Sequence, residues 1–491
     1  MAQTFEDSQL ILAAEDCSDE DFEKYHTFLE YEERIIRSLM AHGPVLLRGG
    51  RGNGKSALLL EANRRLKQDG TGVLGIYLSL RHLPLLKSKG AEYHSHFCRI
   101  LIESINNSLG QLNISPTLEV GTNQDTLREH LVDLSKRIDK RIVLFFDDAA
   151  HIGREADLSE FFDLFRTLSG STISCKAAIY PGVTKFGTRF DVYNDATVLD
   201  IARDERAAYF PKFFLEVLRA RYPSIISKLA SSLSHQPDKF AGFLGRAILG
   251  NMRTFVFACN KLDESSQVGL QELTNGLIYL AADYYWPLLE ELKPKLGIYE
   301  PMIEPSQQIA DALFVSLGET GATSCIIHRD IQQRINKPLE ILEYVGFISK
   351  REASRGMKSG GRGARYSVTL CNLLENIQGK RVTSAIYDEW GKDEKDPFEF
   401  HSGNSTLNVE VPMLDISKDL AILSFPISTL KKSRIYPYGL TESKYEELTH
   451  AGFTTINDLA LATDIQLLAI DGIGSAHLKR IRNVVAQSIW M

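Results

Sequence analysis

The sequence lacks the features of a membrane, secreted or zinc-binding protein. No apolar run approaches the roughly 18 residues that a membrane-spanning helix needs. The N-terminus has no basic stretch followed by an apolar core, so we expect no signal peptide. The six cysteines lie far apart and form no CxxC pair, which predicts reduced thiols without a zinc site or a disulfide framework. We therefore expect a cytoplasmic protein that is not associated with a membrane.

An excess of positive charge is also missing. The 491 residues include 56 Lys and Arg against 63 Asp and Glu, a formal net charge of −7. Proteins that coat DNA unaided are usually basic, so any binding of nucleic acid must depend on local patches. The hydrophobic share of 44% and the charged share of 24% are typical of soluble globular proteins. The length predicts three or four domains.

Strands and helices alternate in the first part of the chain, after an acidic segment, residues 1–25, that we expect to be a flexible arm. Buried strands are predicted at 44–48, 72–80, 141–146, 174–180 and 196–201. Helices are predicted at 30–42, 55–67, 93–109 and 125–138. This alternation predicts an α/β domain over residues 26–202, with a parallel sheet covered by helices on both faces.

The pattern changes four times in the rest of the chain. Residues 203–300 read as helices, and residues 301–376 as a smaller unit of helices and strands. Residues 377–435 are polar and weakly patterned, which indicates a linker or a small segment that docks a partner. Residues 436–491 are helical with glycine turns.

A complete phosphate-binding motif, GxxxxGK[ST], lies between the first predicted strand and the helix that follows it. Its glycines let successive backbone N–H groups surround an anion, and the helix N-terminus adds partial positive charge. Lys55 would reach the β- and γ-phosphates, and the Ser56 hydroxyl would bind Mg²⁺. The predicted cofactors are ATP and Mg²⁺. The residues expected to hold the nucleotide are Gly49, Gly50, Arg51, Gly52, Asn53, Gly54, Lys55, Ser56 and Ala57.

Two carboxylates follow the predicted strand at 141–146. Carboxyl ends of parallel strands meet at one edge of a sheet, so these acids should lie beside the phosphates. We expect Asp147 to hold the hydration shell of Mg²⁺ and Asp148 to orient or deprotonate the attacking water. The side chain of Asp148 is shorter than that of a glutamate, which indicates slow turnover.

Two arginines accompany these motifs, Arg253 at the start of a predicted helix and Arg189 just before the fifth strand. The order of motifs over roughly residues 25–265 resembles the AAA+ ATPases, particularly the branch of the origin-recognition initiators, with a secondary likeness to the STAND NTPases. The resemblance implies that Arg253, in a Gly-Asn-x-Arg stretch, contacts the γ-phosphate from a helical lid. It implies that Arg189 is an arginine finger acting on ATP in a neighbouring subunit. Other candidates for the finger are Lys185, Arg203 and Arg206.

The chain departs from this family pattern in two places. The fourth strand ends in Tyr180-Pro181-Gly182 instead of a clear polar sensor, which leaves Thr184 as the candidate for that role. The spacing between the phosphate loop and the acid pair is long, which implies an extra helix.

Residues 309–370 fit a winged helix, with helices at 309–317, 328–335 and 338–344 and strands at 346–348 and 366–368. The wing, residues 350–365, carries six basic residues against one acid, and such a loop suits DNA phosphates. Glu340 and Glu343 on the third helix would repel them. The alternative use is packing or protein contact. The predicted DNA contacts are Lys350, Arg351, Arg355, Lys358, Arg362 and Arg365.

Residues 440–489 resemble a tandem helix-hairpin-helix unit. The turn from Gly472 to Gly474 exposes N–H groups at a helix start, which suits a DNA phosphate, and Lys479 and Arg480 follow on that helix. Such hairpins also serve in protein contacts.

Three functions fit these features. The first is an ATP-switched AAA+ protein that binds double-stranded DNA as a homo-oligomer, as in replication initiation, transposition or anti-phage defence. The second is a STAND-like signalling ATPase whose C-terminal modules sense a protein or a nucleic acid. The third is a regulatory ATPase subunit that supports a partner effector or nuclease, because the chain itself shows no nuclease, helicase or metal-ligand signature.

Overall fold

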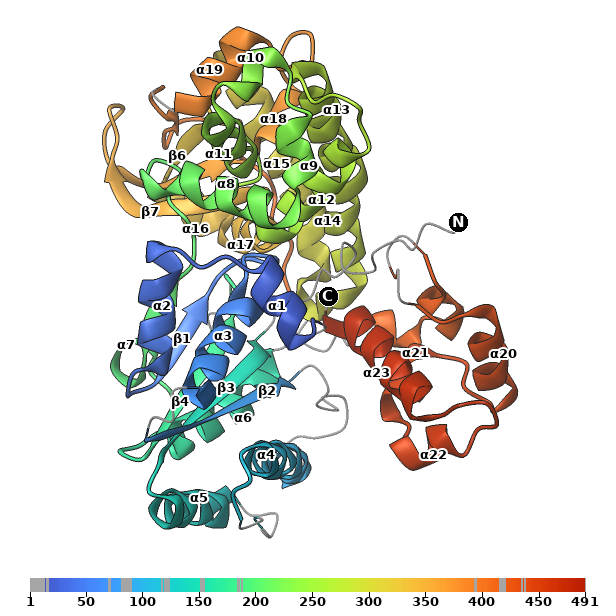
Figure 1. Ribbon diagram of the computed structural model, residues 1–491. Helices are drawn as coiled ribbons and strands as arrows, with labels where there is room; N and C mark the ends of the chain where they lie inside the picture. Colours follow the sequence, from blue (N-terminus) through green and yellow to red (C-terminus); the bar gives the residue numbers. More distant parts are fainter. Residues whose placement is uncertain are drawn as a thin grey trace.

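The computed structural model describes most of the chain, and Figure 1 shows three units within it. An α/β unit lies below a unit of helices and a small sheet, and a C-terminal helical unit extends to one side (Figure 1). The described residues are Ala14, 17–68, 72–80, 91–115, Leu118, 124–150, 155–182, Phe186, 189–392, 395–414, 421–433, Tyr436 and 439–490.

Five parallel strands form the centre of the α/β unit, in the order β2-β3-β4-β1-β5. They are β1 (Val45–Arg48), β2 (Val73–Ser79), β3 (Arg141–Ala150), β4 (Ile173–Ile179) and β5 (Thr197–Asp200). The predicted α/β class with a parallel sheet is confirmed. The strand β3 is longer than predicted, because it continues through Asp147 and Asp148.

Helices cover both faces of this sheet, as the alternation of buried strand residues requires. Val45, Leu47 and Phe145 pack on the side of α2 and α3, whereas Leu46 and Leu144 pack on the side of α4, α5 and α6. Both α4 and α5 lie between β2 and β3, which accounts for the long spacing of the nucleotide motifs. The bounds are α2 (Glu30–Met40), α3 (Lys55–Gln68), α4 (Ala91–Gln111), α5 (Gln124–Ile138) and α6 (Glu155–Leu168).

Part of the segment expected to be a flexible arm is helical, because Asp19–Tyr25 forms helix α1, whereas residues 1–13, 15 and 16 lie outside the described residues. The Ser18 side chain accepts a hydrogen bond from the Asp21 N–H and caps this helix, whose first turn is acidic and so complements the helix dipole. Phe22 is buried, and α1 packs against α8 (Tyr209–Arg221). Seven residues are too few to show a periodic pattern, so the sequence analysis did not predict this helix.

A run of helices follows the α/β unit and covers it from above (Figure 1). Its elements are α8 (Tyr209–Arg221), α9 (Pro223–Ser227), α10 (Ser231–Ser234), α11 (Pro237–Ala247), α12 (Met252–Asp263), α13 (Leu270–Leu280), a π-helical turn (Ala281–Tyr285) and α14 (Trp286–Leu292). The short helix α7 (Val192–Asp195) lies between β4 and β5 and belongs to the α/β unit. Two 3₁₀ turns, Lys293–Lys295 and Gly297–Met302, lead to the next unit. The helix that carries Arg253 thus begins where the sequence predicted a helix start.

The next unit combines helices with a mixed sheet of order β7-β8-β6-β9. Its elements are α15 (Ile303–Thr320), β6 (Ser324–His328), α16 (Arg329–Arg334), α17 (Asn336–Val345), β7 (Ile348–Gly356), β8 (Arg362–Val368), α18 (Leu370–Leu374), α19 (Ser384–Lys392) and β9 (Phe398–Phe400). The three helices and the hairpin lie close to their predicted positions, whereas β6 and β9 were not predicted. Both α19 and β9 belong to the segment expected to be a linker, and they pack on the body through buried Tyr387, Trp390 and Phe400.

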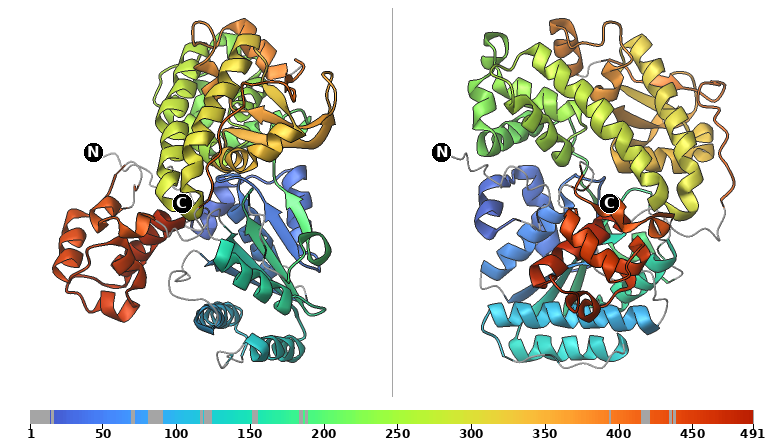
Figure 2. Two further views of the ribbon diagram at one scale, coloured as in Figure 1. Left: turned by 180° about the vertical axis from the view of Figure 1, so that it is seen from behind. Right: turned by 90° about the vertical axis from the view of Figure 1, so that its right-hand side faces the viewer.

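The C-terminal unit has a hydrophobic core of its own, formed by residues between Ile422 and Ile489. Its helices are α20 (Glu442–His450), α21 (Ile456–Leu461), α22 (Asp464–Leu468) and α23 (Ser475–Trp490). Figure 2 shows this unit beside the α/β unit, with α20 and α22 on the side away from the rest of the chain. A separate core of this kind is typical of a module that folds as a unit.

The cysteines are all free thiols, and five of the six are buried. Burial raises the pKa of Cys98 to about 11 and that of Cys175 to about 12, so both thiols stay protonated at neutral pH. No helix among the described residues is both long enough and apolar enough to cross a bilayer.

A buried ion pair joins the loop between β5 and α8 to the β7–β8 hairpin. Arg351 Nη2 lies 2.7 Å from Glu205 Oε2, with side-chain exposures of 8% and 3%. The Ser367 hydroxyl also donates to Glu205, at 2.6 Å. Burial alone would raise the pKa of Glu205, but Arg351 and Ser367 together hold it below its usual value.

Arg351→Ala is expected to lower the free energy of unfolding by about 3–5 kcal/mol, because Glu205 would remain buried without its partner. The folded-state pKa of Glu205 is depressed, so the pair stabilises the fold above the unfolded pKa of about 4.3. That contribution is lost as the pH falls through the folded-state value. Urea unfolding at pH 7 and at progressively lower pH would show the difference from wild type shrinking.

The matched control is Arg355→Ala on the same strand, because Arg355 forms a more exposed pair with Glu352. It should cost less than about 1 kcal/mol. Equal losses for the two variants at pH 7 would contradict the structural role of Arg351.

Candidate nucleotide-binding site

The phosphate loop leaves β1 and enters α3 through a tight turn. Gly52 and Gly54 have φ angles of +81° and +91°, a region that glycine adopts without strain. A Cβ at Gly52 would lie 2.5 Å from Asn251 Oδ1, so only glycine fits there. The turn therefore directs backbone N–H groups and the N-terminus of α3 toward one point, the arrangement that binds a phosphate.

Lys55 is buried at this point. Its Nζ donates to the carbonyls of Gly49, at 2.7 Å, and Gly50, at 3.0 Å, and lies 3.5 Å from the ring centroid of Tyr180. Burial lowers the pKa of Lys55 to about 7, although the charges of the neighbouring Asp147 and Asp148 oppose the shift. A phosphate is a stronger, charged acceptor than either carbonyl, so Lys55 has an ammonium ready to turn to it.

Asp147 and Ser56 lie together at the edge of the sheet. The Ser56 hydroxyl hydrogen-bonds to the Asp147 carboxylate, the Tyr77 hydroxyl donates to Asp147 Oδ2 at 2.6 Å, and the Asp148 N–H donates to Oδ1 at 2.9 Å. Burial, aided by the charge of Asp148, raises the pKa of Asp147 to about 6. A serine hydroxyl beside a carboxylate is the oxygen set that Mg²⁺ takes at nucleoside triphosphate sites. These residues therefore fit the predicted ion.

Asp148 lies beside the same cavity with a strained backbone, at φ +52°. Its Oδ1 is 3.5 Å from the Tyr180 hydroxyl. Left-handed conformations of residues other than glycine cluster at functional sites, where surrounding structure holds them. The strain separates the direction of Asp148 from that of Asp147 and agrees with a role different from metal binding.

The lid helix α12 begins directly on the phosphate loop. Asn251 caps the helix by accepting from the Thr254 N–H, and its Nδ2 donates to the Arg51 carbonyl at 2.6 Å. The N–H groups of Met252 and Arg253 donate to the Gly52 carbonyl at 3.0 and 3.3 Å. The Arg253 Nε is buried at the cavity and has no hydrogen-bond partner among the described residues. A phosphate oxygen would satisfy this donor, as the sequence predicted.

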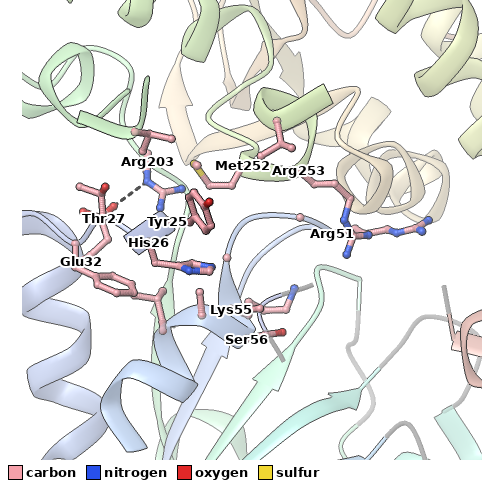
Figure 3. Close-up of a pocket in the computed structure, with 18 of the residues that line it drawn as sticks. Tyr25, His26, Thr27, Glu32, Arg51, Lys55, Ser56, Arg203, Met252 and Arg253 are labelled. Carbon is pink, nitrogen blue, oxygen red and sulfur yellow. Dashed lines mark hydrogen bonds and ion pairs between the residues drawn. The ribbon is translucent and has the colours of Figure 1, made fainter. Parts of the chain in front are cut away.

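The cavity continues past the loop to side chains that the sequence analysis missed. Figure 3 shows Tyr25 and His26 on one side of it, Lys55 and Ser56 below, and Met252 and Arg253 on the lid side. The ring of His26 stacks on that of Phe22, with 4.2 Å between the ring centroids. Burial lowers the pKa of His26 to about 4, so the imidazole is neutral. The aromatic run just before α2 was the available signal. The unpredicted lining includes Tyr25, His26, Thr27, Phe28, Val217 and Arg221.

Of the alternative finger residues, Arg203 has a structural role in this wall. It forms a buried ion pair with Glu32 at 2.8 Å and donates to the Gly250 carbonyl at 3.2 Å, which ties α2 to the lid (Figure 3). Arg189 is exposed just before α7 and does not line the cavity of its own chain. Thr184 and Lys185 lie outside the described residues.

The hairpin β7–β8 presents only part of the predicted basic surface. Arg351 and Arg365 are buried, Arg351 against Glu205 and Arg365 against Ser324 and Glu352. Both guanidinium groups therefore have partners inside the fold, and neither lies on the exposed surface where the sequence analysis expected DNA contacts. Register shifts in the pairing of β7 with β8 change which side chains face inward, and the sequence did not reveal them.

The remaining hairpin residues lie near acids. Arg355 pairs with Glu352 at 2.9 Å, and Lys358 with Asp396 at 2.6 Å. Lys358 and Arg362 are exposed, and Lys350 is half-buried. The basic surface that a nucleic acid could reach is therefore smaller than the sequence suggested.

The glycine turn of the C-terminal unit also lies beside a carboxylate. A Cβ at Gly472 would be 2.9 Å from Glu447 Oε1, and Lys444 Nζ donates to the Gly472 carbonyl at 2.8 Å. Gly474 is exposed at the start of α23, and Lys479 is exposed on that helix, with Arg480 half-buried. Lys444 Nζ also lies 2.8 Å from Glu447 Oε2, so a paired acid and base, and not an unopposed basic surface, adjoin the turn.

Solved structures with detectable likeness to this chain include the following three. Cdc6p of Pyrobaculum aerophilum is 13% identical over 75% of this chain and 96% of that one, with a TM-score of 0.34. The ORC2 protein of Aeropyrum pernix, in ADPNP–ADP complexes, is 10% identical over 74% and 94%, with a TM-score of 0.37. Domain III of the replication initiation protein DnaA of Thermotoga maritima is 18% identical over 52% and 94%, with a TM-score of 0.30.

No protein-family model and no curated protein matches the chain. The TM-scores of the solved structures lie below 0.5. The fold class rests instead on the order of the parallel sheet and on the phosphate loop between β1 and α3.

Above pH 7, the binding of ATP should be accompanied by uptake of a proton by the protein. The pKa of Lys55 is about 7 in the unbound site, and phosphate charge would raise it, so a largely neutral lysine at pH 8 gains a proton on binding. The affinity should therefore fall as the pH rises above 7. Calorimetry at pH 8 in two buffers of different ionisation enthalpy measures this uptake.

Lys55→Arg is the matched control, since a guanidinium stays charged and should take up no proton. Equal proton uptake by the wild type and this variant would assign the effect to another group.

Proposed function

We propose that this chain is an Mg²⁺-dependent ATPase of the AAA+ type. The observation that carries the proposal is the meeting of Lys55, Ser56 and Asp147 at the edge of the sheet, directly after a glycine turn that opens α3. Such a set binds the phosphates and the ion of a nucleoside triphosphate. Isothermal calorimetry of the full chain with Mg²⁺–ATP tests it, and the absence of any heat of binding in wild type would refute it.

Each residue would have a role that follows from its position in the site. Lys55 and Arg253 would hold the phosphates from opposite sides, and Ser56 and Asp147 would hold Mg²⁺, which when bound neutralises charge on the phosphates. Asp148, separated from the metal pair by its left-handed backbone, would orient or accept the proton of the attacking water. The wall of Tyr25, His26 and neighbouring apolar residues would receive the base.

Asp148→Asn is expected to keep nucleotide binding and to lower turnover by about 100-fold or more, because loss of a general base typically costs that much. Phosphate release gives the rate, and calorimetry gives the affinity. The matched control is Asp133→Asn on the exposed side of α5, which should change neither. Full activity in Asp148→Asn would remove the acid from the reaction.

We further propose that nucleotide state controls oligomerisation and the binding of double-stranded DNA. The hairpin β7–β8, with the exposed Lys358 and Arg362 and the half-buried Arg355, supports a phosphate contact. The exposure of Arg189 outside its own cavity supports a role at a neighbouring subunit. Native mass measurement of the chain with and without Mg²⁺–ATP tests the assembly, and an unchanged monomer would count against it.

The triple change of Arg355, Lys358 and Arg362 to Ala should weaken binding to a 30-base-pair duplex at least tenfold. It should reduce the slope of log affinity against log salt by about 3, since each phosphate contact contributes about 0.9. Fluorescence anisotropy at several salt concentrations measures both. Changing the exposed Lys136 and Arg137 on α5 to Ala is the control for loss of charge alone.

A second function, in which the C-terminal unit contacts a protein, is favoured by one observation. Glu447 lies against the Gly472 turn where a DNA phosphate was expected. In that case the chain is a signalling or regulatory ATPase that supports a partner effector. A helix-hairpin-helix variant, Lys479→Ala with Arg480→Ala, would leave DNA affinity unchanged under this alternative and reduce it under the first.

A further inference from the structure

Helix α17, which the sequence analysis placed as the third helix of a winged helix, ends on the phosphate loop. The Arg51 N–H donates to the Tyr344 carbonyl at 3.3 Å. A Cβ at Gly50 would lie 3.3 Å from the carbonyl oxygen of Glu343, so the glycine permits this close approach. Near the start of the helix, Lys337 Nζ donates to the Gly182 carbonyl at 3.1 Å. No residue of α17 is exposed, so the helix cannot reach a DNA groove while it sits here.

Two tyrosines connect this helix to the buried lysine. Tyr180 follows β4, at the position where the sequence lacked a clear polar sensor. Its ring centroid lies 3.5 Å from Lys55 Nζ and 5.0 Å from the ring centroid of Tyr344. Its hydroxyl is 3.5 Å from Asp148 Oδ1. Tyr344 itself lines the cavity, so one helix of the C-terminal half of the chain forms part of the wall of the candidate nucleotide site.

We infer that Tyr180 and Tyr344 couple occupancy of the phosphate loop to the position of α17, so that phosphate binding loosens this helix. The inference rests on the proposed function, because it requires a nucleotide at the loop. Lys55 bonds to the carbonyls of its own loop and lies against the Tyr180 ring. A phosphate draws the ammonium away from both, because a charged acceptor outcompetes a carbonyl and a π face.

The loss reaches α17 through direct contacts. Once Lys55 has turned, Tyr180 no longer has a cation over its ring, so one of the contacts that fix the Tyr180–Tyr344 pair is lost. The Arg51 N–H that now bonds to Tyr344 belongs to the same loop that must close around the phosphates. Linkage then requires the reverse effect: α17 in its seated position must weaken nucleotide binding by the same factor.

Hydrogen exchange on the full chain, with and without Mg²⁺–ATP at concentrations that calorimetry shows to be saturating, tests this coupling. Amides of residues 336–345 should exchange about fivefold faster or more with nucleotide, a typical size for coupling between two sites. Amides of the central strand β1 should not become faster. Saturation without any change in α17 would overturn the coupling and leave the proposed nucleotide site standing. Absence of nucleotide binding would overturn both.

Variants separate the two tyrosines from general destabilisation. Tyr344→Leu keeps apolar volume but removes the ring, so α17 should exchange rapidly in both states and ATP should bind about fivefold more tightly. Tyr344→Phe keeps the ring and should retain the slow exchange of α17 without nucleotide and its acceleration with nucleotide. Tyr193→Ala, an exposed tyrosine on α7, is the control. Unchanged or weaker ATP binding in a folded Tyr344→Leu protein would overturn the inference, and if that variant fails to fold the exchange result on wild type decides.

Discussion

The contact between the carbonyl of Gly52 and the first N–H groups of α12 is the interaction on which the site depends. A helix start has donors without partners inside the helix, and here two of them bond to the phosphate loop itself. The same contact brings Arg253 over the cavity and places Asn251 against the Arg51 carbonyl. A loop built of glycines makes this approach possible, because a side chain at position 52 would collide with Asn251. The phosphate loop and the start of helix α12 are thus joined through one stretch of hydrogen-bonded backbone.

Buried charges serve two different purposes in this molecule. At the candidate nucleotide site, Lys55 and Asp147 have shifted pKa values and lie beside Asp148, as expected of groups that act on a ligand. The pair Glu32–Arg203 in the cavity wall and the pair Glu205–Arg351 away from it are instead mutually neutralised and join separate elements. Arginine is therefore a poor guide to function in this chain until its surroundings are known, since Arg203 and Arg351 serve the fold and Arg253 faces the cavity.

The C-terminal half is more closely bound to the α/β unit than a set of appended binding modules would be. Helix α17 lies on the phosphate loop, and β9 completes the sheet of the hairpin from a segment expected to be a linker. The hairpin carries acids beside its bases, and the glycine turn of the last unit carries Glu447. The exposed basic surface of these two elements is therefore limited in extent.

The sequence by itself determined the parallel sheet, its five strands, the phosphate loop and the acid pair, because these depend on local pattern: apolar runs of strand length, glycines at fixed spacing and acids at a strand end. The helix start at Arg253 was predicted for the same reason, since Asn251 is a local cap. The tertiary structure alone decided which basic residues are buried, because the burial of Arg351 and Arg365 follows from shifts in strand register and from distant acids. It also decided that Tyr25, His26 and Tyr344 meet at one cavity. These residues come from separate parts of the chain, and no spacing along a sequence records a contact that only folding creates.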